Sequence, residues 1–246
     1  MSITTSPGSR PLKSPIFVSV FKGLDPGDVV IDIALDHDST IYGTTFNAFV
    51  TIDAIDAKVT YKKRDPDTGY PNGLGFMPAG TVDPTKEALI GYGPPLAGQA
   101  KNTFRIDLST GELKKVGELN DPAAAVQYVS AGDIISMERN GKAYAVLKKQ
   151  IPSDAAVPES DQLAEIDPTT GKIKALLGSV GSDKTYGLAQ WAGTAYTFHA
   201  QGDINEISLT GGTGKKIMTL TVEGGPGEWY GAGVTTDAPT KPTETK

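Results

Sequence analysis

The chain has 246 residues and a formal net charge of −6, and its 23 Lys and Arg residues are dispersed along it rather than massed. A nucleic-acid partner requires a basic face, so this composition argues against one. The chain has no Cys, which excludes disulfide bonds and thiolate metal sites. No apolar segment is long enough to cross a bilayer, and we therefore expect no membrane insertion.

The N-terminal residues are polar, contain Pro and clusters of Gly or Ser, and lack the apolar run of a signal peptide. We expect residues 1–14 to form a disordered segment. The residues that follow, Pro15–Phe21, are predicted to form a strand that has no partner before it. Because the sequence shows no signal peptide, the compartment stays open, with export or the cell surface as alternatives.

Four similar hairpins then follow in chain order, at residues 50–61, 104–116, 163–176 and 205–218. In each, a short apolar strand ends at a turn rich in Asp, Thr or Gly, and a second, alternating strand follows. The turns Asp107–Gly111 and Asp167–Gly171 are complete Asp-x-x-Thr-Gly sequences. Asp caps backbone N–H groups and Gly accepts a positive φ, so these segments predict β-hairpins.

Two further strands precede each hairpin. The nearer strand has an apolar or aromatic centre, at Tyr42, Ile90, Tyr144 and Tyr196. The farther strand is rich in small residues, at 29–35, 74–80, 126–131 and 186–193. Each unit therefore holds four strands in about fifty residues, the content of one β-propeller blade, with the small-residue strand nearest the axis. The three tyrosines should fill the packing between blades, because Ile90 takes the same position.

A fifth strand of the inner type, Trp229–Thr236, ends the repeats and has no strands after it. Propellers protect their edges by pairing strands from both termini. We therefore predict one all-β domain over residues 15–236, a β-propeller of about five blades whose short last blade combines Pro15–Phe21 with Trp229–Thr236. The alternative is four blades plus extra strands. The Thr- and Pro-rich residues 237–246 are predicted to form a disordered tail.

The repeated unit resembles those of the quinoprotein-like and WD-repeat-like β-propeller superfamily. The resemblance rests on the hairpins at Asp107–Gly111 and Asp167–Gly171 and covers the chain from about Pro15 to Thr236. The Trp-Asp dipeptide of WD repeats and the Trp-bearing signature of quinone-dependent dehydrogenases are both missing from the sequence. The resemblance therefore implies a fold and gives no basis for a quinone cofactor or an enzymatic activity.

Few residues could carry catalysis or bind calcium. The two histidines, His37 and His199, lie in different units, and neither is accompanied by an evident nucleophile and orienting carboxylate. Asp36–Ser39 and Asp65–Gly69 resemble the start of a calcium loop, but neither continues to the acidic residue that completes an EF-hand. We therefore assign both to turns and expect no cofactor, with calcium at these turns as the alternative.

Candidate ligand-binding residues lie in or beside the inner strands, where propellers open their central pocket. They are Trp191, Trp229, Tyr230, Gln190 and Gln127. Aromatic faces offer a large rigid contact area at low entropic cost, and the glutamines supply polar groups. We expect a monomeric, non-enzymatic binding or scaffold propeller that recognises a protein or a glycan through one face of the ring.

The alternative function is a metal-dependent hydrolase, similar to lactonase-type propellers, with its metal in the central channel. Its carboxylates would include Asp32, Asp133 or Glu228. Such a metal needs three or more carboxylate or Asn side chains that converge within ligand distance. Convergence on the channel therefore discriminates between the two hypotheses.

Overall fold

The fold is taken from a computed structural model that describes residues 2–5, 20–94, 100–136, 142–150, 159–222 and 225–239. All regular secondary structure in these residues is β-strand, which confirms the all-β prediction. No helix in these ranges could cross a membrane.

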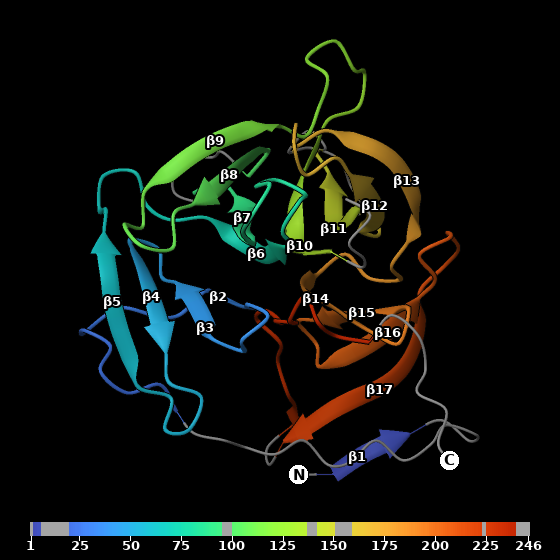
Figure 1. Ribbon diagram of the computed structural model, residues 1–246. Helices are drawn as coiled ribbons and strands as arrows, with labels where there is room; N and C mark the ends of the chain where they lie inside the picture. The colour runs from blue at the N-terminus through green and yellow to red at the C-terminus, as the bar shows by residue number, and fades with distance from the viewer. Residues whose placement is uncertain are drawn as a thin grey trace.

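Four antiparallel sheets of consecutive strands surround a common axis and form the blades of a propeller (Figure 1). Blade one holds β2 (Asp32–Leu35), β3 (Ile41–Thr44), β4 (Ala48–Ile52) and β5 (Val59–Arg64). Blade two holds β6 (Asn72–Met77), β7 (Ala88–Tyr92), β8 (Asn102–Ile106) and β9 (Leu113–Glu118). Blade three holds β10 (Tyr128–Ser136), β11 (Ala143–Lys149), β12 (Gln162–Ile166) and β13 (Ile173–Ser179). Blade four holds β14 (Thr185–Trp191), β15 (Thr194–His199), β16 (Asp203–Ile207) and β17 (Lys215–Val222).

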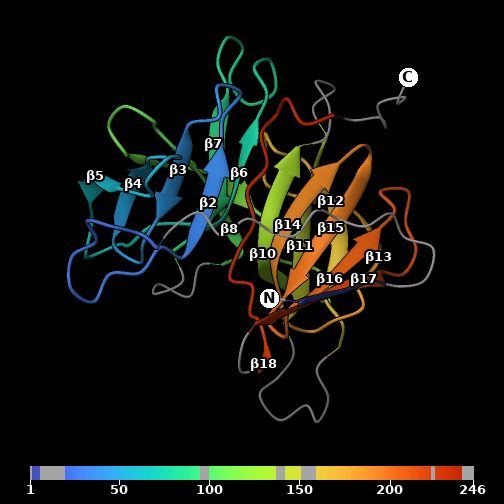
Figure 2. The same cartoon turned by 90° about the horizontal axis from the view of Figure 1, so that it is seen from below.

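The ring has four blades, so the prediction of five is wrong and the four-blade alternative is confirmed. The segment expected to be a fifth inner strand, Trp229–Thr236, forms no strand. It passes between β2 and β14 (Figure 2), where Gly231 and Gly233 approach β2 and Ala232 approaches Gly187 of β14. It has the small residues of an inner strand because it lies between two inner strands. Its hydrogen bonds do not form a strand ladder: the Ala232 N–H donates to the Asp133 carboxylate, and the Thr235 hydroxyl donates to the Asp36 carbonyl.

Two extra strands lie on the fourth sheet. β1 (Ser2–Thr5) pairs with β17, and β18 (Gly225–Pro226) pairs with the end of β17. Four residues of the N-terminal segment that we expected to be disordered are therefore paired. Of the predicted closing strand Pro15–Phe21, only Val20 and Phe21 lie within the described residues, and neither is in a strand. The boundaries at residues 15, 236 and 237 stay predictions.

Removing residues 1–5 should expose the outer edge of β17 and cause the protein to self-associate. β1 covers the backbone of β17 from Met218 to Thr221, and an uncovered strand edge is a template for pairing with another chain. Light scattering after size-exclusion chromatography at increasing concentration would measure this, with Ile3→Val as the control. If the shortened chain stays monomeric and melts at the wild-type temperature, β1 does not protect the edge.

The predicted hairpin turns are present. Asp107 accepts hydrogen bonds from the backbone N–H groups of Ser109 at 2.9 Å and Thr110 at 2.8 Å, and Gly111 has a φ of 70°. The Ser109 hydroxyl first, and then the Thr110 N–H, lower the pKa of Asp107 to about 2. Asp65 likewise accepts from the Thr68 N–H at 3.0 Å. Both carboxylates serve the turns to which we assigned them.

Two of the three predicted tyrosines, Tyr42 and Tyr144, fill the space between neighbouring blades. The Tyr42 ring stacks on Phe49 at 5.8 Å within blade one and meets Phe76 of blade two at 5.5 Å. Tyr144 is buried in a cluster that joins blades three and four, with Leu188 among its members. Burying side chains of this size contributes about 1.5–3 kcal/mol each, so these contacts hold the blades together.

Candidate functional site

The ring has two ends, and a hollow lies at each. The starts of β6, β10 and β14 gather at the end that we call the amino end, around a hollow lined by Asn72, Ser130 and Tyr186. The residues that follow β2 and β6 gather at the opposite end, the carboxyl end, around a hollow lined by His37 and Ala79. The axis between the ends is filled, because the enclosed cavity there has a volume of only 10 Å³.

The structure separates the five predicted site residues between the two ends. Trp191 is the last residue of β14, and Gln190 precedes it, so both lie toward the carboxyl end. Gln127 precedes β10, and Trp229 packs beside Phe198, which pairs with Gly187 near the start of β14. Tyr230 lines the amino-end hollow. The structure therefore does not bring Trp191 and Trp229 together on one face.

Three of the five have a visible structural role. Trp229 donates its Nε1–H to the Gly202 carbonyl at 3.0 Å and is partly buried. Gln190 is buried and donates to the Ala238 carbonyl at 3.2 Å. Gln127 donates to the carbonyls of the turn before β10. Trp191 and Tyr230 expose their rings, at 58% and 68%.

Tyr230 has a partner that the sequence did not single out. Its ring is parallel to that of Tyr186, with the centroids 6.3 Å apart and the planes at 4°. Tyr186 is 41% exposed, and the Tyr230 hydroxyl donates to Glu228. The two rings flank the amino-end hollow, whose volume is 230 Å³. We call this pair and its hollow the tyrosine site.

Polar groups line the same hollow. Tyr92 is 1% exposed, and its hydroxyl finds no hydrogen-bond partner among the described residues. Burial alone raises the pKa of Tyr92 far above its ordinary value, so the hydroxyl stays protonated. Ser130 donates its hydroxyl to the Gly132 carbonyl at 2.8 Å, and the exposed Lys148 borders the hollow. A buried hydroxyl without a partner costs free energy, and this one is closed off from solvent.

Two carboxyl groups face one another among the inner strands, from Asp32 of β2 and Asp133 of β10, and both are buried. Asp32 accepts from the Leu74 N–H at 2.5 Å, and Asp133 accepts from the Leu188 N–H at 3.0 Å. Burial raises the pKa of Asp32 to about 7. Burial, followed by the charge of Asp32, raises the pKa of Asp133 well above its ordinary value. The pair therefore retains a proton near neutral pH.

The third carboxylate of the metal hypothesis lies elsewhere. Glu228 is exposed and accepts from Tyr230 at the amino end, so Asp32 and Asp133 converge without it. Over the ranges that the structure describes, no three His, Asp or Glu side chains form a group that could hold a metal. The carboxyl pair is instead engaged with backbone N–H groups of neighbouring blades.

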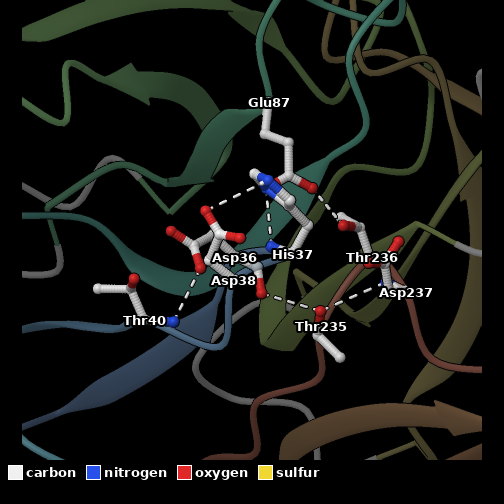
Figure 3. A network of polar contacts seen from close by, with 8 residues as sticks. All are labelled: Asp36, His37, Asp38, Thr40, Glu87, Thr235, Thr236 and Asp237. Atoms are coloured by element: carbon white, nitrogen blue, oxygen red, sulfur yellow. Dashed lines mark hydrogen bonds and ion pairs between the residues drawn. The ribbon is translucent and has the colours of Figure 1, made fainter.

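The carboxyl end holds a polar network around Glu87 (Figure 3). Glu87 accepts from the backbone N–H of His37 at 2.9 Å, faces its Nδ1 at 2.8 Å, and accepts from the Thr236 hydroxyl. The Thr235 hydroxyl donates to the Asp36 carbonyl at 2.8 Å. The hydrogen bond to Glu87 raises the pKa of His37. The network fastens the 229–236 segment to blades one and two, beside a hollow of 590 Å³.

The second histidine is enclosed. His199 lies in blade four between the hydroxyls of Thr185, at 3.1 Å, and Thr197, at 3.0 Å. It is almost fully buried, and burial lowers its pKa, so it is neutral near pH 7 and closed to a substrate. His37 is exposed but is engaged with Glu87.

A repeated Tyr-Gly dipeptide was the signal that could have revealed Tyr186. Tyr186-Gly187 and Tyr230-Gly231 occupy matching places in two inner segments. The contribution of Tyr92 could not be read from the sequence, because its lack of a hydrogen-bond partner is a property of the assembled blades.

Solved structures with similar folds are β-propellers. A chain of the nidogen/laminin complex is 12% identical over 75% of this chain and 77% of that chain, with a TM-score of 0.43. A chain of the mitotic checkpoint complex is 10% identical over 87% and 71%, with a TM-score of 0.45. The PQQ-bound aldose sugar dehydrogenase of Streptomyces coelicolor is 12% identical over 95% and 88%, with a TM-score of 0.45. No protein-family model matches the sequence, and no curated protein is similar to it in sequence.

Proposed function

We propose that this protein is a monomeric, non-enzymatic binding propeller that recognises a glycan through the tyrosine site. The observation that carries the proposal is the pair of exposed, parallel rings of Tyr186 and Tyr230 at the edge of a hollow with polar walls. Binding sites typically combine aromatic surface with a few well-placed polar groups. The enclosed His199 and the engaged His37 support a role in binding rather than catalysis.

The chemistry of the site favours a sugar. A pyranose ring has a face of C–H groups that packs on an aromatic ring and an edge of hydroxyls that forms hydrogen bonds. The tyrosine rings offer the first contact, and the ammonium of the exposed Lys148 offers the second. At 230 Å³ the hollow is smaller than most sites for whole small molecules, which span about 300–1,000 Å³. It therefore suits one sugar unit of a longer chain.

Replacing Tyr230 or Tyr186 with Ala should weaken glycan binding by about 1–2 kcal/mol, a rise in Kd of roughly 5- to 30-fold. Each change removes one stacking face while the backbone stays in place. Isothermal titration calorimetry with cello-, manno-, xylo- and chitohexaose would measure it. Trp191→Ala is the matched control, because Trp191 is an equally exposed aromatic residue at the opposite end.

Two results would contradict the proposal. One is that none of the four hexasaccharides binds the wild-type protein at millimolar concentration. The other is that Trp191→Ala costs as much affinity as Tyr230→Ala, which would place the ligand at the carboxyl end.

A further inference from the structure

One carboxylate oxygen connects the two segments that carry the tyrosine pair. Tyr186 and Tyr230 are each followed by Gly, and the residue after each Gly donates its backbone N–H to Oδ2 of Asp133. The Leu188 N–H reaches this oxygen at 3.0 Å and the Ala232 N–H at 2.9 Å. The two rings therefore lie at the same short chain distance from one shared acceptor.

The glycines let the two segments lie in contact beside this oxygen. A Cβ on Gly187 would lie 2.9 Å from the carbonyl carbon of Gly231 and 3.0 Å from Ala232. A Cβ on Gly231 would lie 2.9 Å from Oδ1 of Asp32. Real Cβ atoms do not approach backbone atoms as closely as 2.9 Å, so Gly187 must be Gly, and a side chain at residue 231 would displace the Asp32 carboxylate. The close contact leaves the two backbones little freedom to shift while Asp133 holds them.

The two segments differ in what else fixes them. β14 is fixed by its ladder with β15, in which Gly187 pairs with Phe198. The segment that carries Tyr230 belongs to no ladder, and its Ala232 N–H bonds to Asp133 instead of to a neighbouring strand. Asp133 thus fixes the segment that pairs with no strand to the inner strands, at a point two residues from Tyr230.

We propose that Asp133 is the positioning residue of the tyrosine site: its Oδ2 holds the backbones after Tyr186 and Tyr230 together and so sets the spacing of the rings on which the ligand stacks. The inference rests on the proposed function for its biological meaning, but the spacing of the rings can be tested without a ligand. Asp133 is buried and does not line the hollow, so it acts through the two tyrosines.

The first test measures the ring-current effect of one tyrosine on the other by NMR. Stacked rings shift each other's resonances, so Tyr230→Ala should move the ring signals of Tyr186 in the wild-type background. In an Asp133→Ala background the same replacement should leave those signals unmoved. Asp133→Asn keeps an acceptor oxygen and should preserve the effect. Asp32→Ala is the matched control, since it removes an equally buried carboxyl that accepts no hydrogen bond from either tyrosine-bearing segment.

A second variant covers the case in which Asp133→Ala does not fold. Ala232→Pro removes the N–H that the Tyr230 segment donates to Asp133 and leaves the bond from Leu188 to Asp133 intact. It should also abolish the ring-current effect. With whichever of the four hexasaccharides binds, Asp133→Ala and Ala232→Pro should raise Kd about tenfold, while Asp133→Asn and Asp32→Ala should stay within about threefold.

The two proposals fail in different ways. If the ring-current effect persists in both Asp133→Ala and Ala232→Pro, Asp133 does not position the tyrosines, whatever the protein binds. If the effect is lost as expected but no hexasaccharide binds the wild-type protein, the positioning role stands and the glycan-binding function is wrong.

Discussion

Replacing Asp133 with Ala should lower the free energy of unfolding by about 2–4 kcal/mol, because buried donors that lose their acceptor cost about 1–3 kcal/mol each. Asp133 accepts from the N–H groups of Leu188 and Ala232 inside a channel whose cavity of 10 Å³ has room for little water. Urea unfolding at pH 5, where the carboxyl pair retains a proton, would measure the loss.

Asp133→Asn is the control for this loss, because the amide oxygen can accept the same two hydrogen bonds. We expect it to cost less than about 1 kcal/mol at pH 5. Equal losses for the Ala and Asn variants would mean that the hydrogen bonds to Asp133 contribute little and that the side chain matters only for its volume.

Stability should also fall as the pH rises through the neutral range, and Asp133→Asn should weaken this dependence. The pKa of Asp32 is raised to about 7 in the folded protein, from an ordinary value near 4. The folded state therefore binds protons more tightly than the unfolded chain. Its stabilising effect is complete below about pH 4 and is lost as the pH rises toward 7 and, for Asp133, beyond.

The variant isolates this effect because an amide at residue 133 carries no charge. Oδ1 of Asp133 has no hydrogen-bond partner among the described residues, and an amide nitrogen there could donate toward Asp32. The stability of Asp133→Asn relative to wild type should rise between pH 5 and pH 8, because the variant no longer loses the stabilising proton of Asp133. Subtracting the wild-type free energy of unfolding from that of the variant cancels the contributions of Asp161 and His199, which also titrate from buried positions. If this difference in the free energy of unfolding does not change with pH, the pair of Asp32 and Asp133 does not hold a proton in the folded protein.

The repeats predicted the blades well, because hairpins are specified locally. The Asp-x-x-Thr-Gly turns place a capping carboxylate and a positive-φ glycine exactly where two alternating strands must meet, as at Asp107–Gly111. The blade count failed at Trp229–Thr236, which has the small residues of an inner strand. Its partners are side chains such as Asp133 and Glu87, from positions far away in the sequence. The sequence of such a segment does not distinguish it from a strand that pairs with a neighbouring strand.

The N-terminal strand was missed for a different reason. Ser2–Thr5 contains β-branched residues that favour strands, but it is short and lies in a polar segment. Its pairing partner, β17, is more than two hundred residues away. Whether four residues form an edge strand depends on the strand with which they pair. Here that strand is β17, whose free edge exists only after the fourth blade has formed.

The site was predicted in part. Tyr230 was identified from its place in an inner segment, and its exposure agrees with a role at the surface. Trp229 had the same sequence signal but packs against Phe198, because its indole fits beside β15. Tyr186 and Tyr92 come from other blades. Their meeting at one hollow depends on the order and spacing of the blades, which composition does not encode.

A sugar that stacks on the tyrosine pair at the amino end should perturb both rings at once. The most direct measurement is an NMR titration of the wild-type protein with the hexasaccharides, following the tyrosine ring signals and the Trp indole N–H signals. We predict that the signals of Tyr186, Tyr230 and Tyr92 shift together along one binding curve while the indole signal of Trp191 stays in place. Shifts confined to Trp191, or tyrosine signals that stay unchanged at saturating sugar, would contradict the account.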